Sequence, residues 1–276
     1  MNYINIQEID SLQEWVKDAI AIKKNPLQNK SLGENKTLGM LFFNPSLRTR
    51  LSTQKAALNL GMNVMVMNFT NEGWTLEFED GAIMNQGASE HIKEAAQVVS
   101  QYCDIIAIRA FAGLTDKEKD NAETVLAGFL KYATVPIVNM ESATGHPLQS
   151  LADAITMEEH KTAHRPKVVL SWAPHPKALP QAVANSFVQM MQLQEADFYN
   201  VISTSVPIEG GEIVFSDNPP YETGQNITIT AVAAPNYKFS HWEGALTGLE
   251  VSKQLVLSNN IEVVAFFIPL ERFAQQ

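Results

Sequence analysis

The chain has 276 residues, of which 45% are apolar and 18% charged, a composition typical of soluble globular proteins with material for two cores. Its apolar runs are too short for a transmembrane helix, and residues 1–15 lack the apolar segment of a secretory signal, so we expect a cytoplasmic protein without a membrane partner. Cys103 is the only cysteine, which excludes an internal disulfide and a thiolate zinc cluster. The net charge of −10 argues against a nucleic-acid partner, although a local basic pocket can still hold phosphate.

The first part of the chain alternates apolar strand-like runs with helical patterns. A continuous apolar run such as KTLGMLFFN (36–44) is typical of a strand buried in a parallel sheet. The alternation predicts right-handed crossovers and a mostly parallel α/β sheet. In chain order we predict strand 36–44, helix 46–61, strand 63–69, helix 88–102, strand 104–111, helix 117–133, strand 135–140, helix 146–161, strand 167–174 and helix 179–193.

The composition changes near residue 198. All ten methionines lie at or before Met191. Beyond residue 198, runs of Ile, Thr and Val alternate with Gly, Pro and Asn, a pattern that predicts β-hairpins and no further helix. We therefore predict three parts: an α/β domain over 1–150, a linker helix with the remnant of a truncated second α/β domain over 151–198, and a β-rich module over 199–276.

The segment FFNPSLRTR (42–50) leads from an apolar strand into a helix. Helix N-termini expose unpaired N–H groups and a partial positive charge, so they attract anions. Arg48 and Arg50 add forked donors that match phosphate, with Ser46 as the N-cap. The residues alone leave two interpretations open, an anion site and an ordinary capped helix with solvated arginines.

A second polar cluster, ESATGHPLQ (141–149), follows the strand at 135–140 and opens the next helix. Loops at the carboxyl ends of parallel strands converge on one crevice, and Arg109 ends another strand of the same sheet. His146 and Gln149 are three residues apart and share a helix face. A His-Pro turn and a solvated arginine are the plain alternatives for each residue by itself.

These motifs resemble the aspartate/ornithine carbamoyltransferase family. The segments EGWTLE (72–77), NME (139–141) and SWAPHP (171–176) are similar to the branch that acts on N-acetylornithine or N-succinylornithine, and the similarity covers about residues 1–195. The resemblance implies a parallel-sheet carbamoyl-phosphate-binding domain and carbamoyl transfer to the δ-amine of an N-acylornithine in arginine biosynthesis. It implies neither a cofactor nor a metal, and leaves acetyl and succinyl specificity open.

The resemblance also implies roles for individual residues. Trp74 would come from the neighbouring subunit of a homotrimer to close the site, and the loop over 87–91, with Ser89, would contact the acyl group. The implied carbamoyl-phosphate-binding set is Ser46, Leu47, Arg48, Thr49, Arg109, His146 and Gln149. Three of these would stabilise the developing oxyanion, namely Arg109, His146 and Thr49. The acylated ornithine would contact Glu141 and His175.

Residues 205–268 resemble instead a divergent internalin-type B-repeat, through segments such as GGEI (210–213), PNYKF (235–239) and SHWEG (240–244). This resemblance implies a small β-grasp-like module for adhesion or spacing. The His-Cys-Leu-Pro segment of the carbamoyltransferase second domain has no match here. Three interpretations therefore stay open: an active carbamoyltransferase, a catalytically incompetent carbamoyl-phosphate-binding half fused to a β-rich interaction module, and an interaction module on an inert scaffold.

Overall fold

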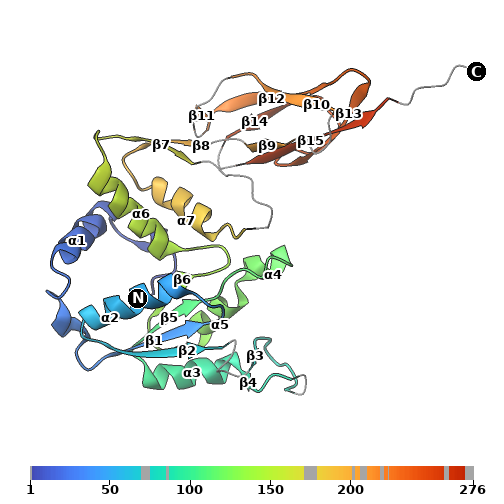
Figure 1. Ribbon diagram of the computed structural model, residues 1–276. Helices are drawn as coiled ribbons and strands as arrows, with labels where there is room; N and C mark the ends of the chain where they lie inside the picture. The colour runs from blue at the N-terminus through green and yellow to red at the C-terminus, as the bar shows by residue number, and fades with distance from the viewer. Residues whose placement is uncertain are drawn as a thin grey trace, which may run out of the picture. The chain divides into compact units, whose positions relative to one another are not determined.

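The computed structural model describes residues 2–69, 75–84, 87–170, 179–200, 203–205, 210–217, 221–222, 224–257 and 261–270. Its packing divides the chain into two units (Figure 1). The first unit comprises residues 1–161 and 176–194, and the second comprises residues 162–175 and 195–276.

The first unit is built on a parallel sheet in the order β2-β1-β5-β6, with helices on both faces (Figure 1). This architecture confirms the predicted α/β fold class. The strands are β1 (Thr37–Phe42), β2 (Asn63–Asn68), β5 (Ile105–Arg109) and β6 (Ile137–Glu141), with a separate short pair, β3 (Leu76–Glu77) and β4 (Glu90–His91). The helices are η1 (Ile6–Glu8), α1 (Leu12–Lys24), η2 (Lys30–Gly33), α2 (Leu47–Asn59), α3 (Ile92–Tyr102), α4 (Lys117–Ala122), α5 (Thr124–Tyr132), α6 (Pro147–His160) and α7 (Ala182–Met191).

Alternate residues of the sheet face two separate cores. Leu41 and Ile108 join the core under α3 and α5, which contains the fully buried Phe129. Met40 points to the other face, into the core that α2 closes with Ala57. Because both faces are covered, the central strands are apolar at successive positions rather than at every second one.

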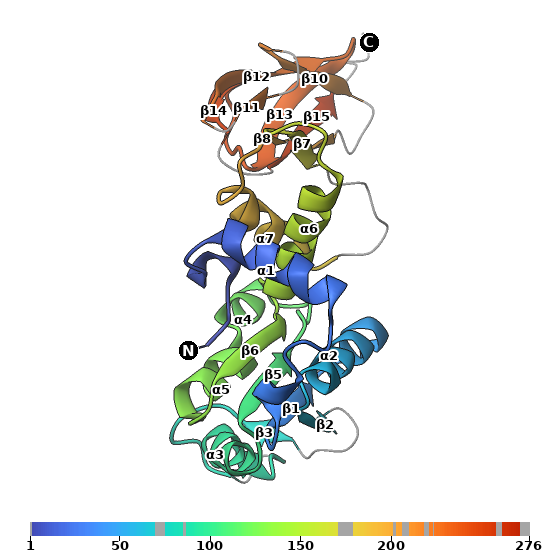
Figure 2. The same cartoon turned by 90° about the vertical axis from the view of Figure 1, so that its left-hand side faces the viewer.

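The helices differ from the sequence predictions in several places. The short helices η1 and η2 were not predicted, and the helix predicted over 88–102 begins only at Ile92, after the strand β4. A single helix is predicted over 117–133, but the structure breaks it at Glu123, whose φ is 45°. No Gly or Pro marks the break, so the helical pattern carried no signal for it. Helix α1 was not predicted; it is capped by Ser11, buries Leu12 and Val16, and lies against α6 (Figure 2).

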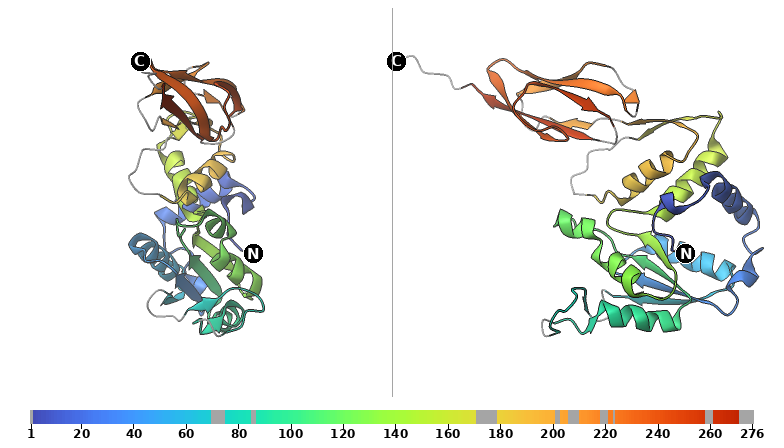
Figure 3. Two further views of the ribbon diagram at one scale, coloured as in Figure 1. Left: turned by 90° about the vertical axis from the view of Figure 1, so that its right-hand side faces the viewer. Right: turned by 180° about the vertical axis from the view of Figure 1, so that it is seen from behind.

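The second unit is β-rich, as predicted. Two three-stranded sheets, β10-β12-β14 and β13-β15-β9, enclose a core of Ile229, Trp242 and Phe267 (Figure 3). The Trp242 indole N–H donates to the Glu250 carbonyl at 2.7 Å, which satisfies its only polar group. The strands are β9 (Ser203–Ser205), β10 (Gly211–Phe215), β12 (Asn226–Ala233), β13 (Tyr237–Gly244), β14 (Ser252–Val256) and β15 (Glu262–Pro269).

A third sheet, β11-β8-β7, joins the two sequence regions of the second unit. Strand β7 (Lys167–Leu170) pairs in parallel with β8 (Asp197–Asn200), which pairs antiparallel with β11 (Tyr221–Glu222). The boundaries of the two units thus differ from the boundaries predicted at residues 150 and 198. Helices α6 and α7 belong to the first unit, whereas β7 belongs to the second. None of the helices that the structure describes has the length and apolar character needed to cross a bilayer.

Candidate functional site

The carboxyl ends of three parallel strands are tied together by the Arg109 guanidinium. Arg109 is 8% exposed, and its Nε and Nη2 lie 2.9 and 2.8 Å from Glu141 Oε2 at the end of β6. Its Nη1 donates to the carbonyl oxygens of Asn44 and Pro45, at 3.3 and 3.2 Å, just after β1. The Asn44 side chain in turn accepts the Phe111 N–H at 2.6 Å, after β5. The turn before α2 and the turn after β6 therefore share one buried cation.

The turn after β1 leads into α2 and contains the residues that the sequence analysis predicted to bind an anion. Ser46 has an extended backbone and caps α2, with its Oγ accepting the Thr49 N–H at 3.4 Å. Leu47 and Arg48 are exposed, and the first turn of α2 contains no acidic residue. A helix start that carries Arg48 and Arg50 places two cations against the positive end of the helix dipole, an arrangement that an anion would stabilise.

His146 is brought to the same edge of the sheet by the turn that follows β6. Its Nε2 lies 3.9 Å from Glu141 Oε2, and its backbone N–H donates to Ser186 Oγ of α7 at 2.7 Å. Burial lowers the pKa of His146; nearby Glu141 opposes this effect and Arg109 adds to it. The imidazole is therefore neutral near pH 7, and its buried Nδ1 has no hydrogen-bond partner among the described residues.

The remaining predicted site residues fall into two groups. Gln149 lies one helical turn from His146 on α6, where its Nε2 donates to Asp153 Oδ1 at 2.8 Å. Burial raises the pKa of Asp153, an effect that the Gln149 hydrogen bond opposes. Trp74 and His175 lie outside the described residues.

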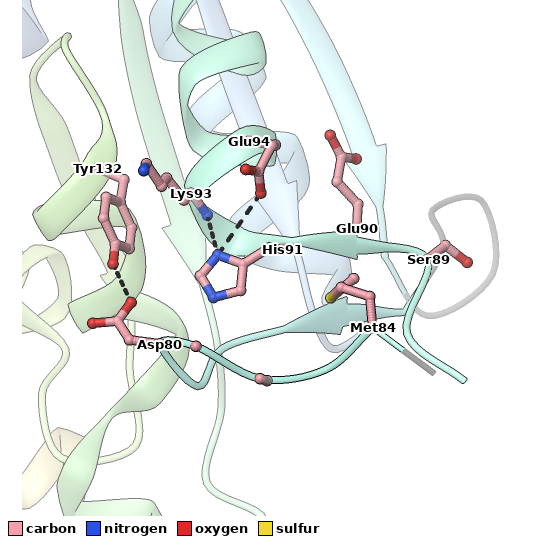
Figure 4. A pocket seen from close by; sticks show the side chains of 10 residues that line it. Asp80, Met84, Ser89, Glu90, His91, Lys93, Glu94 and Tyr132 are labelled. Atoms are coloured by element: carbon pink, nitrogen blue, oxygen red, sulfur yellow. Dashed lines mark hydrogen bonds and ion pairs between the residues drawn. The ribbon is translucent and has the colours of Figure 1, made fainter. Parts of the chain in front are cut away.

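A separate open hollow of about 580 Å³ includes Ser89, the residue predicted to lie near an acyl group (Figure 4). The His91 side chain connects two segments that line this hollow. Its Nδ1 accepts the Lys93 N–H at the start of α3, and its Nε2 lies 3.1 Å from the Glu79 carbonyl oxygen. Asp80 faces Tyr132 on the other side (Figure 4). These contacts tie Asp80 to α5 and connect the Glu79 backbone to His91, the residue that caps α3.

The sequence analysis missed several groups that support the site. Asn44 was within a quoted motif, but only the fold shows that its side chain ties two turns. Ser186 and Asn185 reach the turn after β6 from α7, about forty residues along the chain, and no local pattern indicates them. Within the described part of the chain, no group of three or more His, Cys, Asp or Glu side chains is arranged to hold a metal ion.

The residues at this edge of the sheet are of types that can bind an anion and polarise a carbonyl group beside it. Backbone N–H groups and guanidinium forks suit a phosphate. A buried guanidinium and a neutral imidazole can donate to an oxygen on which negative charge develops. The arrangement therefore suits acyl-phosphate chemistry without a nucleophilic side chain.

Comparisons with known proteins agree with the motifs. Residues 2–159 match the family model "Aspartate/ornithine carbamoyltransferase, carbamoyl-P binding domain", and residues 202–269 match "Divergent InlB B-repeat domain". Both predicted resemblances are thus confirmed. The N-succinylornithine carbamoyltransferase of Bacteroides thetaiotaomicron is 53% identical over 193 residues, which cover 70% of this chain and 61% of that enzyme. The N-acetylornithine carbamoyltransferase of Xanthomonas axonopodis pv. citri is 41% identical over 182 residues, 65% of this chain and 51% of that enzyme.

Solved structures show the same similarity. A crystal structure of acetylornithine transcarbamylase complexed with acetylcitrulline superposes with a TM-score of 0.66 at 35% identity, covering 75% of this chain and 61% of that one. A mutant N-acetyl-L-ornithine transcarbamylase complexed with carbamyl phosphate and N-succinyl-L-norvaline gives the same TM-score, identity and coverage. The chain thus spans 61% of these structures and of the Bacteroides enzyme.

Replacing His146 with Gln should make the stability of the protein less sensitive to acid. A histidine in an unfolded chain has a pKa of about 6.5, and the pKa of His146 in the folded protein is lower. Below about pH 6.5 the unfolded state therefore binds more protons than the folded state. The free energy of unfolding of the wild type should therefore fall as the pH drops from about 6.5 through the pKa of His146 in the folded protein. A glutamine at this position does not titrate, so the variant should lack this pH-dependent loss of stability. Chemical denaturation at about pH 7.5 and 5.5 measures the effect. A difference between the two proteins that does not change with pH would contradict it.

Proposed function

Because the chain belongs to the aspartate/ornithine carbamoyltransferase family, we propose that it binds carbamoyl phosphate where β1 leads into α2. We further propose that it transfers the carbamoyl group to the δ-amine of an N-acylornithine, either N-acetyl- or N-succinylornithine, in arginine biosynthesis. The observation that carries this proposal is the junction at Arg109, which joins the α2 corner to the turn before His146.

In the proposed reaction the neutral δ-amine attacks the carbamoyl carbon. A C–N bond forms, the C–O bond to phosphate breaks, and the amine loses a proton as phosphate departs. Negative charge develops on the carbamoyl oxygen, toward which we assign Arg109, His146 and Thr49 as donors. Ser46, Leu47, Arg48 and Thr49 would hold the phosphate, partly through backbone N–H groups. Holding both substrates in one crevice would supply much of the remaining rate enhancement.

On the substrate side the proposed set includes Gln149 for the carbamoyl group and Glu141 with His175 for the acylated ornithine. Glu141 is already engaged by the Arg109 guanidinium, so a contact with the amine substrate would extend that ion pair rather than use an isolated carboxylate. The names of the relatives and the ligands of the related structures support this assignment of substrate class.

Replacing Arg48 with Ala should weaken carbamoyl phosphate binding by about 10- to 100-fold, because a charge-assisted phosphate contact contributes about 1.5–3 kcal/mol. Isothermal titration calorimetry measures the affinity. Lys55→Ala is the matched control, since it removes an exposed cation about two turns further along α2. An Arg48→Ala affinity equal to that of the wild type would contradict the placement of the phosphate.

The second candidate function is a carbamoyl-phosphate-binding half that does not turn over and is fused to a β-rich interaction module. One observation favours it: residues 202–269 match a different family model. A product assay separates the two candidates. We expect N-acylcitrulline from carbamoyl phosphate and an N-acylornithine if the chain is active; heat of carbamoyl phosphate binding without this product would favour the second.

We also propose that the chain forms a homotrimer in which Trp74 of one subunit closes the site of the next. Helix α2 supports an assembly surface, because Leu47, Leu51 and Leu58 lie on one face and are 75%, 59% and 57% exposed. Exposed apolar side chains gathered in this way are typical of an interface.

Replacing Leu51 with Asp should dissociate the trimer into monomers, because it places a charge in the apolar stripe of α2. Sedimentation velocity measures the mass of the wild type and the variant. Leu32→Asp is the control, since Leu32 is 64% exposed and lies on η2. A wild type that sediments as a monomer would contradict the shared site.

A further inference from the structure

Glu123 occupies an unusual backbone position between α4 and α5. Its φ and ψ are 45° and 44°, in the left-handed region. A residue with a side chain is strained there and persists only where its surroundings hold it in place. The strained position therefore calls for contacts that compensate it.

Those contacts converge on one oxygen of the carboxylate. Glu123 Oε1 accepts hydrogen bonds from the Ser142 hydroxyl at 2.5 Å, the Thr144 N–H at 2.8 Å and the Thr144 hydroxyl at 2.7 Å. Both residues belong to the turn that follows β6. A charged acceptor makes stronger hydrogen bonds than a neutral one, so the helix junction holds this turn firmly.

The turn leads directly into His146. Within it, the Ser142 N–H donates to the Gly145 carbonyl at 2.7 Å, and the Gly145 N–H donates to the Ser142 hydroxyl at 3.1 Å. From the other side, Asn185 of α7 donates to the Thr144 carbonyl at 3.1 Å. The backbone entering His146 is therefore clamped between Glu123 and α7.

We propose that Glu123 is a positioning residue that sets the place of the His146 imidazole beside Arg109 and Glu141. It acts through Ser142 and Thr144 and does not itself touch the substrate. The inference rests on the proposed function, because the positioned imidazole is the one assigned to the carbamoyl oxygen. The competing explanation is that Glu123 only connects two helices, in which case its carboxylate would have no effect on the site.

Substitution of Glu123 separates these explanations. Glu123→Gly relieves the left-handed backbone and removes the carboxylate, whereas Glu123→Gln keeps the Oε1 acceptor. We expect the glycine variant to bind carbamoyl phosphate at least about tenfold more weakly than the wild type and the glutamine variant within about threefold, measured by calorimetry. Asn35→Gly is the matched control, because Asn35 is another left-handed residue, with φ of 61°, at an exposed position before β1.

A second readout does not depend on binding. The groups that act on the titration of His146 are Glu141, Arg109 and Asp153. Nuclear magnetic resonance of the imidazole should show its pKa rising toward the ordinary value in Glu123→Gly, because a loosened turn exposes the ring to water. The pKa should stay at its wild-type value in the glutamine variant and in Asn35→Gly.

Wild-type affinity together with an unchanged His146 titration in Glu123→Gly would overturn the proposal. If that variant does not fold, Thr144→Val replaces it, because this change removes one of the three hydrogen bonds to Glu123 at similar side-chain volume. It should shift the affinity and the His146 pKa in the same directions by smaller amounts. No shift in either measurement would overturn the proposal. Absence of carbamoyl phosphate binding in the wild type would refute the proposed function, while the titration would still decide the role of Glu123.

Discussion

The buried ion pair between Arg109 and Glu141 is the interaction on which the arrangement of the site depends. It joins the ends of two neighbouring parallel strands, and the same guanidinium holds the carbonyl oxygens of Asn44 and Pro45 before α2. Removing one partner of such a pair leaves a charge buried alone, at a cost of about 3–5 kcal/mol. Two turns that could each move independently are therefore held in one geometry, with the start of α2 on one side and a neutral histidine on the other.

A second layer of contacts supports this junction from outside the strands. Glu123 and α7 hold the turn before His146, and a buried imidazole kept neutral by its surroundings can donate a hydrogen bond without carrying a charge. The electrostatic balance is local: a fixed cation, a fixed carboxylate and an uncharged ring lie within one water-poor corner. Such an arrangement is prepared before any ligand binds, which is how preorganised sites lower the energy of developing charge.

The second unit shows how strands from two different sequence regions combine. Strand β7 follows the helix α6, and by itself it would leave two rows of backbone N–H and C=O groups unpaired. In the described structure β8 pairs with it in parallel and β11 of the B-repeat-like region extends the same sheet. Arg165 strengthens this joint through its Nε, which donates to Asp197 Oδ1 at 3.1 Å. The strand-like run at 167–174 was predicted, but its partner was not.

Local sequence patterns were enough to predict the α/β class, most strands and helices of the first unit, the β-rich character of the tail and the motifs of the candidate site. These follow from local causes: apolar periodicity, helix caps and the chemistry of a few adjacent residues. Three features became visible only in the folded chain: Arg109 engages Glu141, the helix predicted over 117–133 breaks at Glu123, and β7 pairs with β8. Each of these depends on contacts between residues tens of positions apart, whose buried charges and unpaired backbone groups find their partners only when the chain is packed.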